Sequence, residues 1–88
     1  MGSFDGHCVV VTGGASGIGE ATVRGIVAEG GRVLIADLQE DRANELLREL
    51  GEAVAFHHTD VTREQDIVDA IEQAQQRFGP LTGMVNNA

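Results

Sequence analysis

Glycines at a fixed spacing give the first indication of chemistry in this sequence. From Thr12 to Gly19 the chain reads Thr-Gly-Gly-Ala-Ser-Gly-Ile-Gly. Gly13 allows a tight turn, Gly17 lets the backbone approach a pyrophosphate, and Gly19 lets a following helix pack closely on a sheet. Free amides and the helix dipole then favour a bound anion. The spacing predicts a dinucleotide phosphate site, and Glu20 excludes a lysine-dependent phosphate loop.

A carboxylate supports this interpretation and indicates which dinucleotide binds. Asp37 lies 18 residues after Gly19, at the end of the second predicted strand, where an acidic side chain can accept hydrogen bonds from an adenosine ribose. A 2′-phosphate would meet a like charge there, and the positions best placed to compensate, Ser16 and Leu38, are neutral. The residues therefore favour NAD over NADP. The alternatives are an ordinary glycine-rich turn and a solvated aspartate, but the two features together favour a binding site.

Strand-like and helix-like patterns alternate around these residues. Apolar runs predict strands at 8–12, 32–37, 53–58 and 81–86. Helical spacing predicts three helices between them, and Gly30-Gly31, Gly51 and Gly79-Pro80 end these helices. The expected inward faces carry Ile18, Ala21, Gly25 and Ile26 in the first helix, Ala43, Leu46, Leu47 and Leu50 in the second, and Ile67, Ile71, Ala74 and Phe78 in the third.

Thr62 and Gln65 have the spacing of a capping box, which predicts that the third helix opens at Thr62. The order β-α-β-α-β-α-β requires parallel strands with right-handed crossovers. The fold class is therefore α/β, the first half of a Rossmann-type doubly wound parallel sheet with strand order 3-2-1-4. Residues 1–88 form one NAD-binding half-domain in this interpretation. The glycine loop and Asp37 both lie at the carboxyl ends of strands.

These motifs resemble the short-chain dehydrogenase/reductase family. The pattern T-G-x-x-x-G-x-G runs from Thr12 to Gly19, an Asp60-Val61 pair follows the third strand, and Asn86-Asn87-Ala88 matches the start of an Asn-Asn-Ala-Gly element. The three motifs occur in the family's order and span nearly the whole chain.

The resemblance implies a role for individual residues. Asp60 would contact the adenine amino group, and Val61 would line the adenine pocket. Asn87 would lie along the cofactor through its backbone, and Asn86 would brace the central strands. Ser16 and Ile18 would contact the ribose and pyrophosphate through the glycine loop.

The family's catalytic residues have no counterparts in this chain. They are a tyrosine, a lysine four residues later, a preceding serine and an asparagine on the fourth helix, whereas this sequence has no tyrosine, no lysine, and serines only at positions 3 and 16. We therefore expect no catalytic residue here, a truncated chain that is inactive alone, and a catalytic part beyond Ala88.

The resemblance implies that the parent protein is an NAD(H)-dependent oxidoreductase. It would transfer hydride between nicotinamide and a small-molecule secondary alcohol or ketone, with a faint similarity to hydroxyacyl-CoA dehydrogenases. The alternative is a non-catalytic dinucleotide-binding or self-associating fragment. Because the fourth strand would be a bare edge, we expect homo-oligomers.

Composition excludes several other classes of function. The net charge of −8 argues against nucleic acid and anionic membranes as partners. One cysteine, Cys8, cannot form an internal disulfide, which together with the absence of a secretory signal predicts a cytoplasmic protein. His57 and His58 point to opposite faces of a strand and cannot easily share an ion with Asp60, so no metal site is expected.

Overall fold

The computed structural model describes residues 2–87 and contains one parallel sheet of four strands. The strands are β1 (Cys8–Thr12), β2 (Arg32–Asp37), β3 (Val54–His58) and β4 (Gly83–Asn86), in the order β3-β2-β1-β4. The helices are α1 (Gly17–Ala28), α2 (Glu40–Leu50) and α3 (Glu64–Phe78), with a short 3-10 helix, η1 (Gly51–Ala53), after α2. The predicted fold class and strand order are confirmed.

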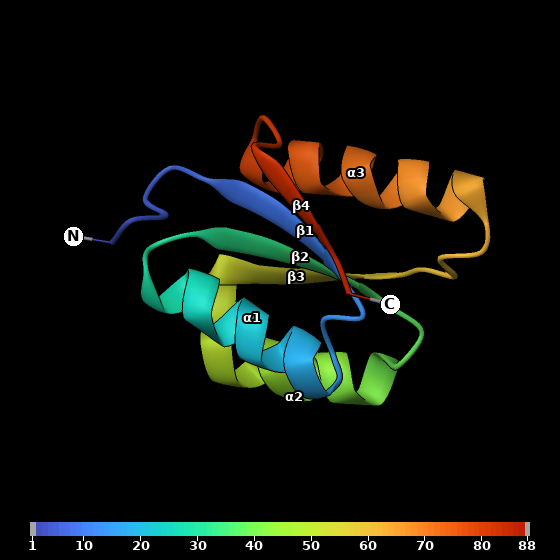
Figure 1. Cartoon of the computed structure of the whole chain (residues 1–88), viewed down its shortest axis with the longest axis horizontal. Coiled ribbons are helices and arrows are strands. Elements are labelled where there is room, and N and C mark those ends of the chain that lie inside the picture. The colour runs from blue at the N-terminus through green and yellow to red at the C-terminus, as the bar shows by residue number, and fades with distance from the viewer. Residues whose placement is uncertain (1, 88) are drawn as a thin grey trace.

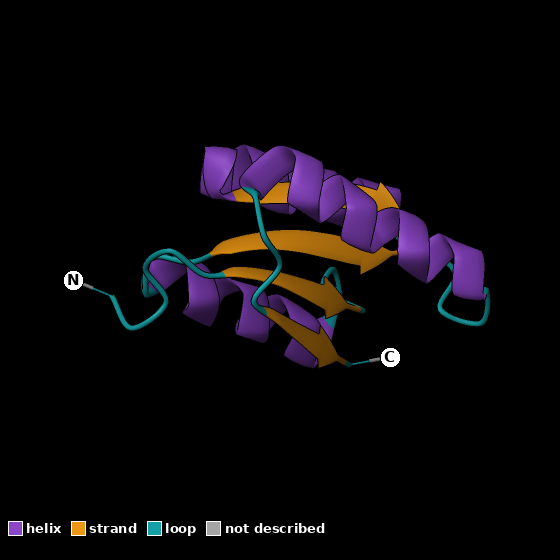
Figure 2. Cartoon of the chain, turned by 90° about the horizontal axis from the view of Figure 1, so that it is seen from above, coloured by secondary structure: helices purple, strands orange, loops and turns teal. Residues whose placement is uncertain are grey.

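The helices cover both faces of the sheet. Helices α1 and α2 lie together on one face and α3 lies on the other (Figure 1), and the sandwich of helix, sheet and helix is also visible from above (Figure 2). Both β1 and β2 are central strands, and all five residues of β1 are buried. This burial on both faces explains why β1 reads as a continuous apolar run rather than an alternating one.

The two faces of the sheet bury side chains of different size. Larger residues fill the layer under α1 and α2, including Val9, Val11, Val23, Ile26, Ile35 and Leu46. The layer under α3 holds Val10 and Leu34 from the sheet, and its other buried side chains are small: Cys8, Ala36, Ala55, Ala70 and Ala74. The small residues of α3 allow that helix to approach the sheet closely.

The predicted inward face of α1 is wrong except at Ile26, which is buried as expected. The buried residues of this helix are Gly19, Val23 and Ile26, whereas Ile18 is 77% exposed and Ala21 and Gly25 are also exposed. The reason is that the backbone of Gly19 packs directly against the preceding loop, which rotates the helix so that its 19, 23, 26 face meets the sheet.

The predicted capping box at the start of α3 is also wrong. The helix begins at Glu64, its N-cap residue is Arg63, and no side chain caps it. Thr62 donates its hydroxyl hydrogen bond to Asp60 instead, and Gln65 donates to Asp69. The short-range bond to Asp60 forms a local turn, so the helix starts later than the sequence pattern suggests.

The inward face of α3 is only partly as predicted. Ala74 is buried, but the second fully buried residue is Ala70, while Ile67, Ile71 and Phe78 are half-buried.

Strands β3 and β4 begin one and two residues later than expected, because residue 53 belongs to η1 and residues 81–82 precede the β4 ladder. Within residues 2–87, no helix is long and apolar enough to cross a membrane.

Candidate functional site

The loop between β1 and α1 turns sharply at its first glycine. Gly13 has a φ of 67°, in the left-handed region that favours glycine, and its N–H donates to the carbonyl oxygen of Ala36 at 2.8 Å. Gly17 has a φ of 38°, and a Cβ built there would meet no atom within 4 Å. The backbone at Gly17 is therefore open on the side where a ligand could approach.

The third glycine of the loop allows a close backbone contact. A Cβ on Gly19 would lie 1.9 Å from the carbonyl oxygen of Gly13 and 2.8 Å from Nδ2 of Asn87. No side chain fits between these groups, so only glycine permits the start of α1 to pack here. Gly19 therefore provides a close contact, but the contact is to the loop that follows β1 and to Asn87 rather than to the sheet, where the sequence predicts it.

Asp37 is buried and holds two backbone segments together. Its side chain is 8% exposed and accepts hydrogen bonds of 3.0 Å from the N–H groups of Ala15 and Gln39, one at each carboxylate oxygen. It is therefore not a solvated turn residue. A carboxylate has about four lone-pair sites, so each oxygen keeps acceptor capacity for a ligand hydroxyl. Sequence reasoning did not foresee that Asp37 also anchors the glycine loop.

The turn between β3 and α3 is held by short hydrogen bonds around Asp60. Its Oδ1 accepts from the backbone N–H of Thr62 at 2.9 Å and from the Thr62 hydroxyl at 2.6 Å. The hydrogen bond from the Thr62 side chain, followed by that from its backbone, lowers the pKa of the Asp60 carboxyl below its ordinary value. These bonds favour the ionised form of Asp60, and both of them use Oδ1 and leave Oδ2 outside the turn.

A buried threonine joins this turn to Asp37. Thr59 is 1% exposed, its N–H donates to the carbonyl oxygen of Asp37 at 3.0 Å, and its hydroxyl donates to the carbonyl oxygen of His57 at 2.8 Å. Sequence reasoning missed Thr59, because a threonine next to a strand end carries no special signal.

A cavity of about 210 Å³ lies between the two loops. It brings together several of the predicted site residues, and its lining is Gly13, Ala36, Asp37, Leu38, Thr59, Asp60, Val61 and Thr62. Its wall carries two carboxylates and the half-exposed side chain of Val61. The cavity can accept a group that donates hydrogen bonds to these carboxylates.

The remaining predicted residues follow β1 and β4 and are not part of the lining of this cavity. Ser16 and Ile18 are exposed at the start of α1. Asn87 donates its backbone N–H to the hydroxyl of Thr12 at 2.9 Å, and that hydroxyl lies 3.0 Å from Oδ1 of Asn86, as a donor to it. Thr12 therefore ties β1 to β4, in keeping with the bracing role implied for Asn86. The sequence pattern placed Thr12 at the start of the glycine motif but did not predict that its hydroxyl joins the two strands.

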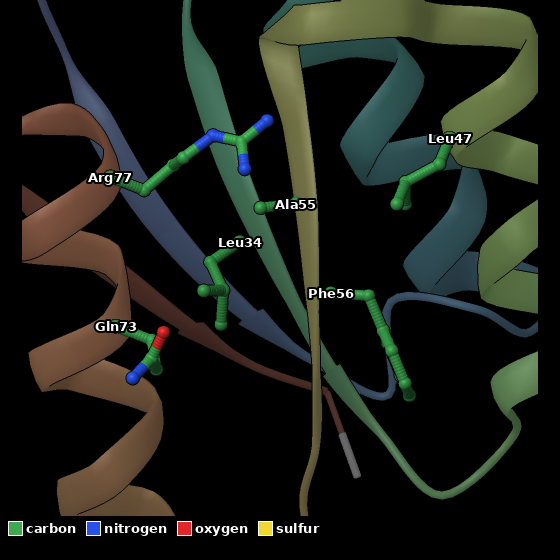
Figure 3. Close-up of a pocket in the computed structure, with 6 residues that line it drawn as sticks. All are labelled: Leu34, Leu47, Ala55, Phe56, Gln73 and Arg77. Carbon is green, nitrogen blue, oxygen red and sulfur yellow. The ribbon is translucent and has the colours of Figure 1, made fainter.

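A second cavity, of about 190 Å³, lies beside β3 and has no part in this arrangement. Its lining residues come from both faces of the sheet: Leu34, Leu47, Ala55, Phe56, Gln73 and Arg77 (Figure 3). It shares no residue with the cavity between the two loops and has neither a carboxylate nor a nucleophile. Within residues 2–87, no group of acidic, histidine or cysteine residues could hold a metal ion.

Comparisons with known proteins agree on one family. The family model described as short chain dehydrogenase matches residues 7–88. Momilactone A synthase of Oryza sativa is 48% identical over 84 residues, which cover 94% of this chain and 31% of that protein. The Drosophila melanogaster 3-hydroxyacyl-CoA dehydrogenase type-2 is 44% identical over 79 residues, covering 90% of this chain and 31% of that protein.

Solved structures show the same similarity in three dimensions. A 3-ketoacyl-(acyl-carrier-protein) reductase from Brucella melitensis, complexed with NADH, has a TM-score of 0.93 and 32% identity over 98% of this chain and 35% of that chain. A 3-hydroxyacyl-CoA dehydrogenase type-2 from Mycobacterium avium has a TM-score of 0.87 and 44% identity over 96% of this chain and 33% of that chain. The chain spans about a third of the length of these relatives.

Proposed function

The chain belongs to the short chain dehydrogenase family, and from that premise we propose that it binds the adenosine and pyrophosphate portion of NAD. The observation that carries the proposal is the cavity in which Asp37 and Asp60 meet beside the glycine loop. The ribose hydroxyls would donate to Asp37, whose oxygens keep free lone pairs. The adenine amino group would donate to Asp60, and Val61 would cover the adenine ring.

The glycine loop fits the charged part of the same cofactor. The space beside Gly17 is free of side chains, and α1 begins at that residue, so its first N–H groups and its dipole face the loop. Ser16 and Ile18 are exposed beside this space. Asn87, held through Thr12, would lie along the cofactor with its backbone.

NAD is proposed in preference to NADP because of the charge around Asp37. A 2′-phosphate would be placed next to this buried carboxylate, and neither Ser16 nor Leu38 can offset the repulsion. The relative complexed with NADH is a family member at 32% identity, and this similarity supports a nicotinamide dinucleotide as the ligand.

We further propose that the whole protein is an oxidoreductase for a secondary alcohol or ketone. Bound NAD supplies the carbon that accepts or donates hydride. The residues of this chain hold and orient the adenosine end, while proton transfer and substrate binding would reside in residues outside it. The identity to two proteins described as 3-hydroxyacyl-CoA dehydrogenase type-2 makes a hydroxyacyl substrate the first class to test.

Calorimetric titration of the chain with NAD and with NADP tests the cofactor assignment. We expect NAD to bind, and NADP to bind about tenfold more weakly because of the added like charge. Asp37→Asn is the informative variant, since its amide oxygen can still accept one of the two backbone hydrogen bonds. Asp37→Asn should bind NAD more weakly than the unmodified chain does, and the difference in affinity between NAD and NADP should become smaller. Equal affinity for both cofactors in the unmodified chain would contradict the assignment.

A further inference from the structure

Helix α3 reaches back to the turn that precedes it through one carboxylate. Oδ2 of Asp66, in the first turn of α3, accepts a hydrogen bond of 2.9 Å from the backbone N–H of Asp60. No other acceptor among residues 2–87 receives this N–H. The bond spans from the helix to a residue two positions after the end of β3, so it constrains the turn between them.

The position of Asp60 depends on few other contacts. Its own carbonyl oxygen accepts from Arg63 at 2.9 Å, and its side chain accepts from Thr62, but both partners belong to the same turn. These local bonds shape the turn without attaching it to the rest of the molecule. Attachment comes from Thr59 on the strand side and from Asp66 on the helix side.

We propose that Asp66 is a positioning residue that holds the Asp60-Val61 turn in the conformation that forms the wall of the cavity. The inference rests on the proposed function only in taking this cavity as the adenine site. A charged acceptor forms a stronger hydrogen bond to an amide than a neutral one does, and the half-buried setting of Asp66 reduces competition from water. The residue need not touch the ligand, because it acts through the backbone of Asp60.

The chain contains a matched control in the same helical turn. Glu64 is also an acidic residue of the first turn of α3, but it is exposed and its side chain makes no hydrogen bond among the described residues. Glu64→Ala and Asp66→Ala both remove a favourable charge from the helix N-terminus. Only Asp66→Ala also removes the hydrogen bond to Asp60, so the difference between the two variants isolates that bond.

The first measurement is amide hydrogen exchange by NMR on the full 88-residue chain. Asp66→Ala should speed exchange of the Asp60 N–H about tenfold, the cost of one charge-assisted hydrogen bond. In Asp66→Asn the amide oxygen can still accept the hydrogen bond, so the exchange rate of the Asp60 N–H should stay within about threefold of that in the unmodified chain. The same limit is expected for Glu64→Ala. Unchanged exchange in Asp66→Ala would overturn the inference, whatever the chain binds.

The second measurement is titration of the same proteins with adenosine 5′-monophosphate as the probe. We expect Asp66→Ala to weaken binding about five- to tenfold, with Asp66→Asn and Glu64→Ala close to the unmodified chain. Equal binding by Asp66→Ala would overturn the positioning role, as would equal losses in Asp66→Ala and Glu64→Ala. If the unmodified chain does not bind the probe, the proposed function fails for this chain, and the exchange measurement alone decides the role of Asp66.

Discussion

The two loops that form the wall of the cavity are held in place by opposite means. The loop after β1 depends on missing side chains, since the contact between Gly19 and Gly13 leaves no room for a Cβ. The turn after β3 depends on side chains that are present, namely those of Asp60, Thr62 and Asp66. The first loop should therefore be sensitive to added atoms as well as to loss of its one hydrogen bond to the Asp37 side chain, whereas the second turn should be sensitive only to removed hydrogen bonds.

The largest effect is expected from adding one methyl group to the first loop. Gly19→Ala would place a Cβ 1.9 Å from the carbonyl oxygen of Gly13, so backbone must move. Overpacking of this kind costs about 3 kcal/mol or more in the free energy of unfolding. Urea unfolding would measure the loss. A variant as stable as the unmodified chain would show that α1 does not pack as described.

Asp37→Ala should have the next largest effect, because it removes the side-chain hydrogen bond between the first loop and β2 and leaves only the backbone bond from Gly13 to Ala36. The N–H of Ala15 would lose its acceptor while remaining buried, which costs about 2 kcal/mol. Asp37→Asn keeps an acceptor and should lose less than half of that amount. Urea unfolding of both variants tests this order, and equal stability of Asp37→Ala and the unmodified chain would mean that water replaces the carboxylate.

Gly17→Ala tests whether the two glycines of the first loop have different roles, Gly17 in ligand binding and Gly19 in packing. The added Cβ meets nothing within 4 Å, so the cost to stability is only about 1 kcal/mol for a left-handed φ of 38°. Ligand binding should suffer more than stability does, since the methyl group points into the space proposed for the pyrophosphate. Titration with NAD beside urea unfolding separates the two effects. A fall in stability as large as that of Gly19→Ala would contradict this distinction.

The smallest effect is expected from removing one hydroxyl from the second turn. The hydrogen bonds from Thr62 lower the pKa of Asp60, so ionisation of Asp60 stabilises the folded turn. With the folded pKa below the unfolded one, this stabilisation is present above the ordinary value, about 3.9, and is lost as pH falls through the folded pKa. Thr62→Val should raise the pKa of Asp60 toward its ordinary value.

An NMR titration of the Asp60 carboxyl carbon in the two proteins measures this shift. If Thr62→Val left the pKa of Asp60 where it is in the unmodified chain, the hydroxyl would have no part in holding the turn.

Much of the fold follows from local patterns in the sequence. Continuous apolar runs separated by helical repeats predict a parallel sheet with right-handed crossovers, and the glycine loop after the first strand indicates the Rossmann-type strand order that is observed. The glycine spacing predicts the sharp turn at Gly13, since its left-handed φ is a property of that residue and its neighbours. These features depend on contacts that are close in sequence or on rules shared by all such sheets.

Other features were decided only when the chain packed. Apolar residues occur on more than one side of α1, so periodicity could not tell that Val23 rather than Ile18 faces the core; the contact between Gly19 and Gly13 decides it. The hydrogen bond between Asp37 and Ala15 joins residues far apart in the chain, so no local pattern encodes it. Sequence alone determined which residues reach the carboxyl edge of the sheet, whereas tertiary structure decided which of their polar groups pair, because hydrogen-bond partners depend on distances that only packing sets.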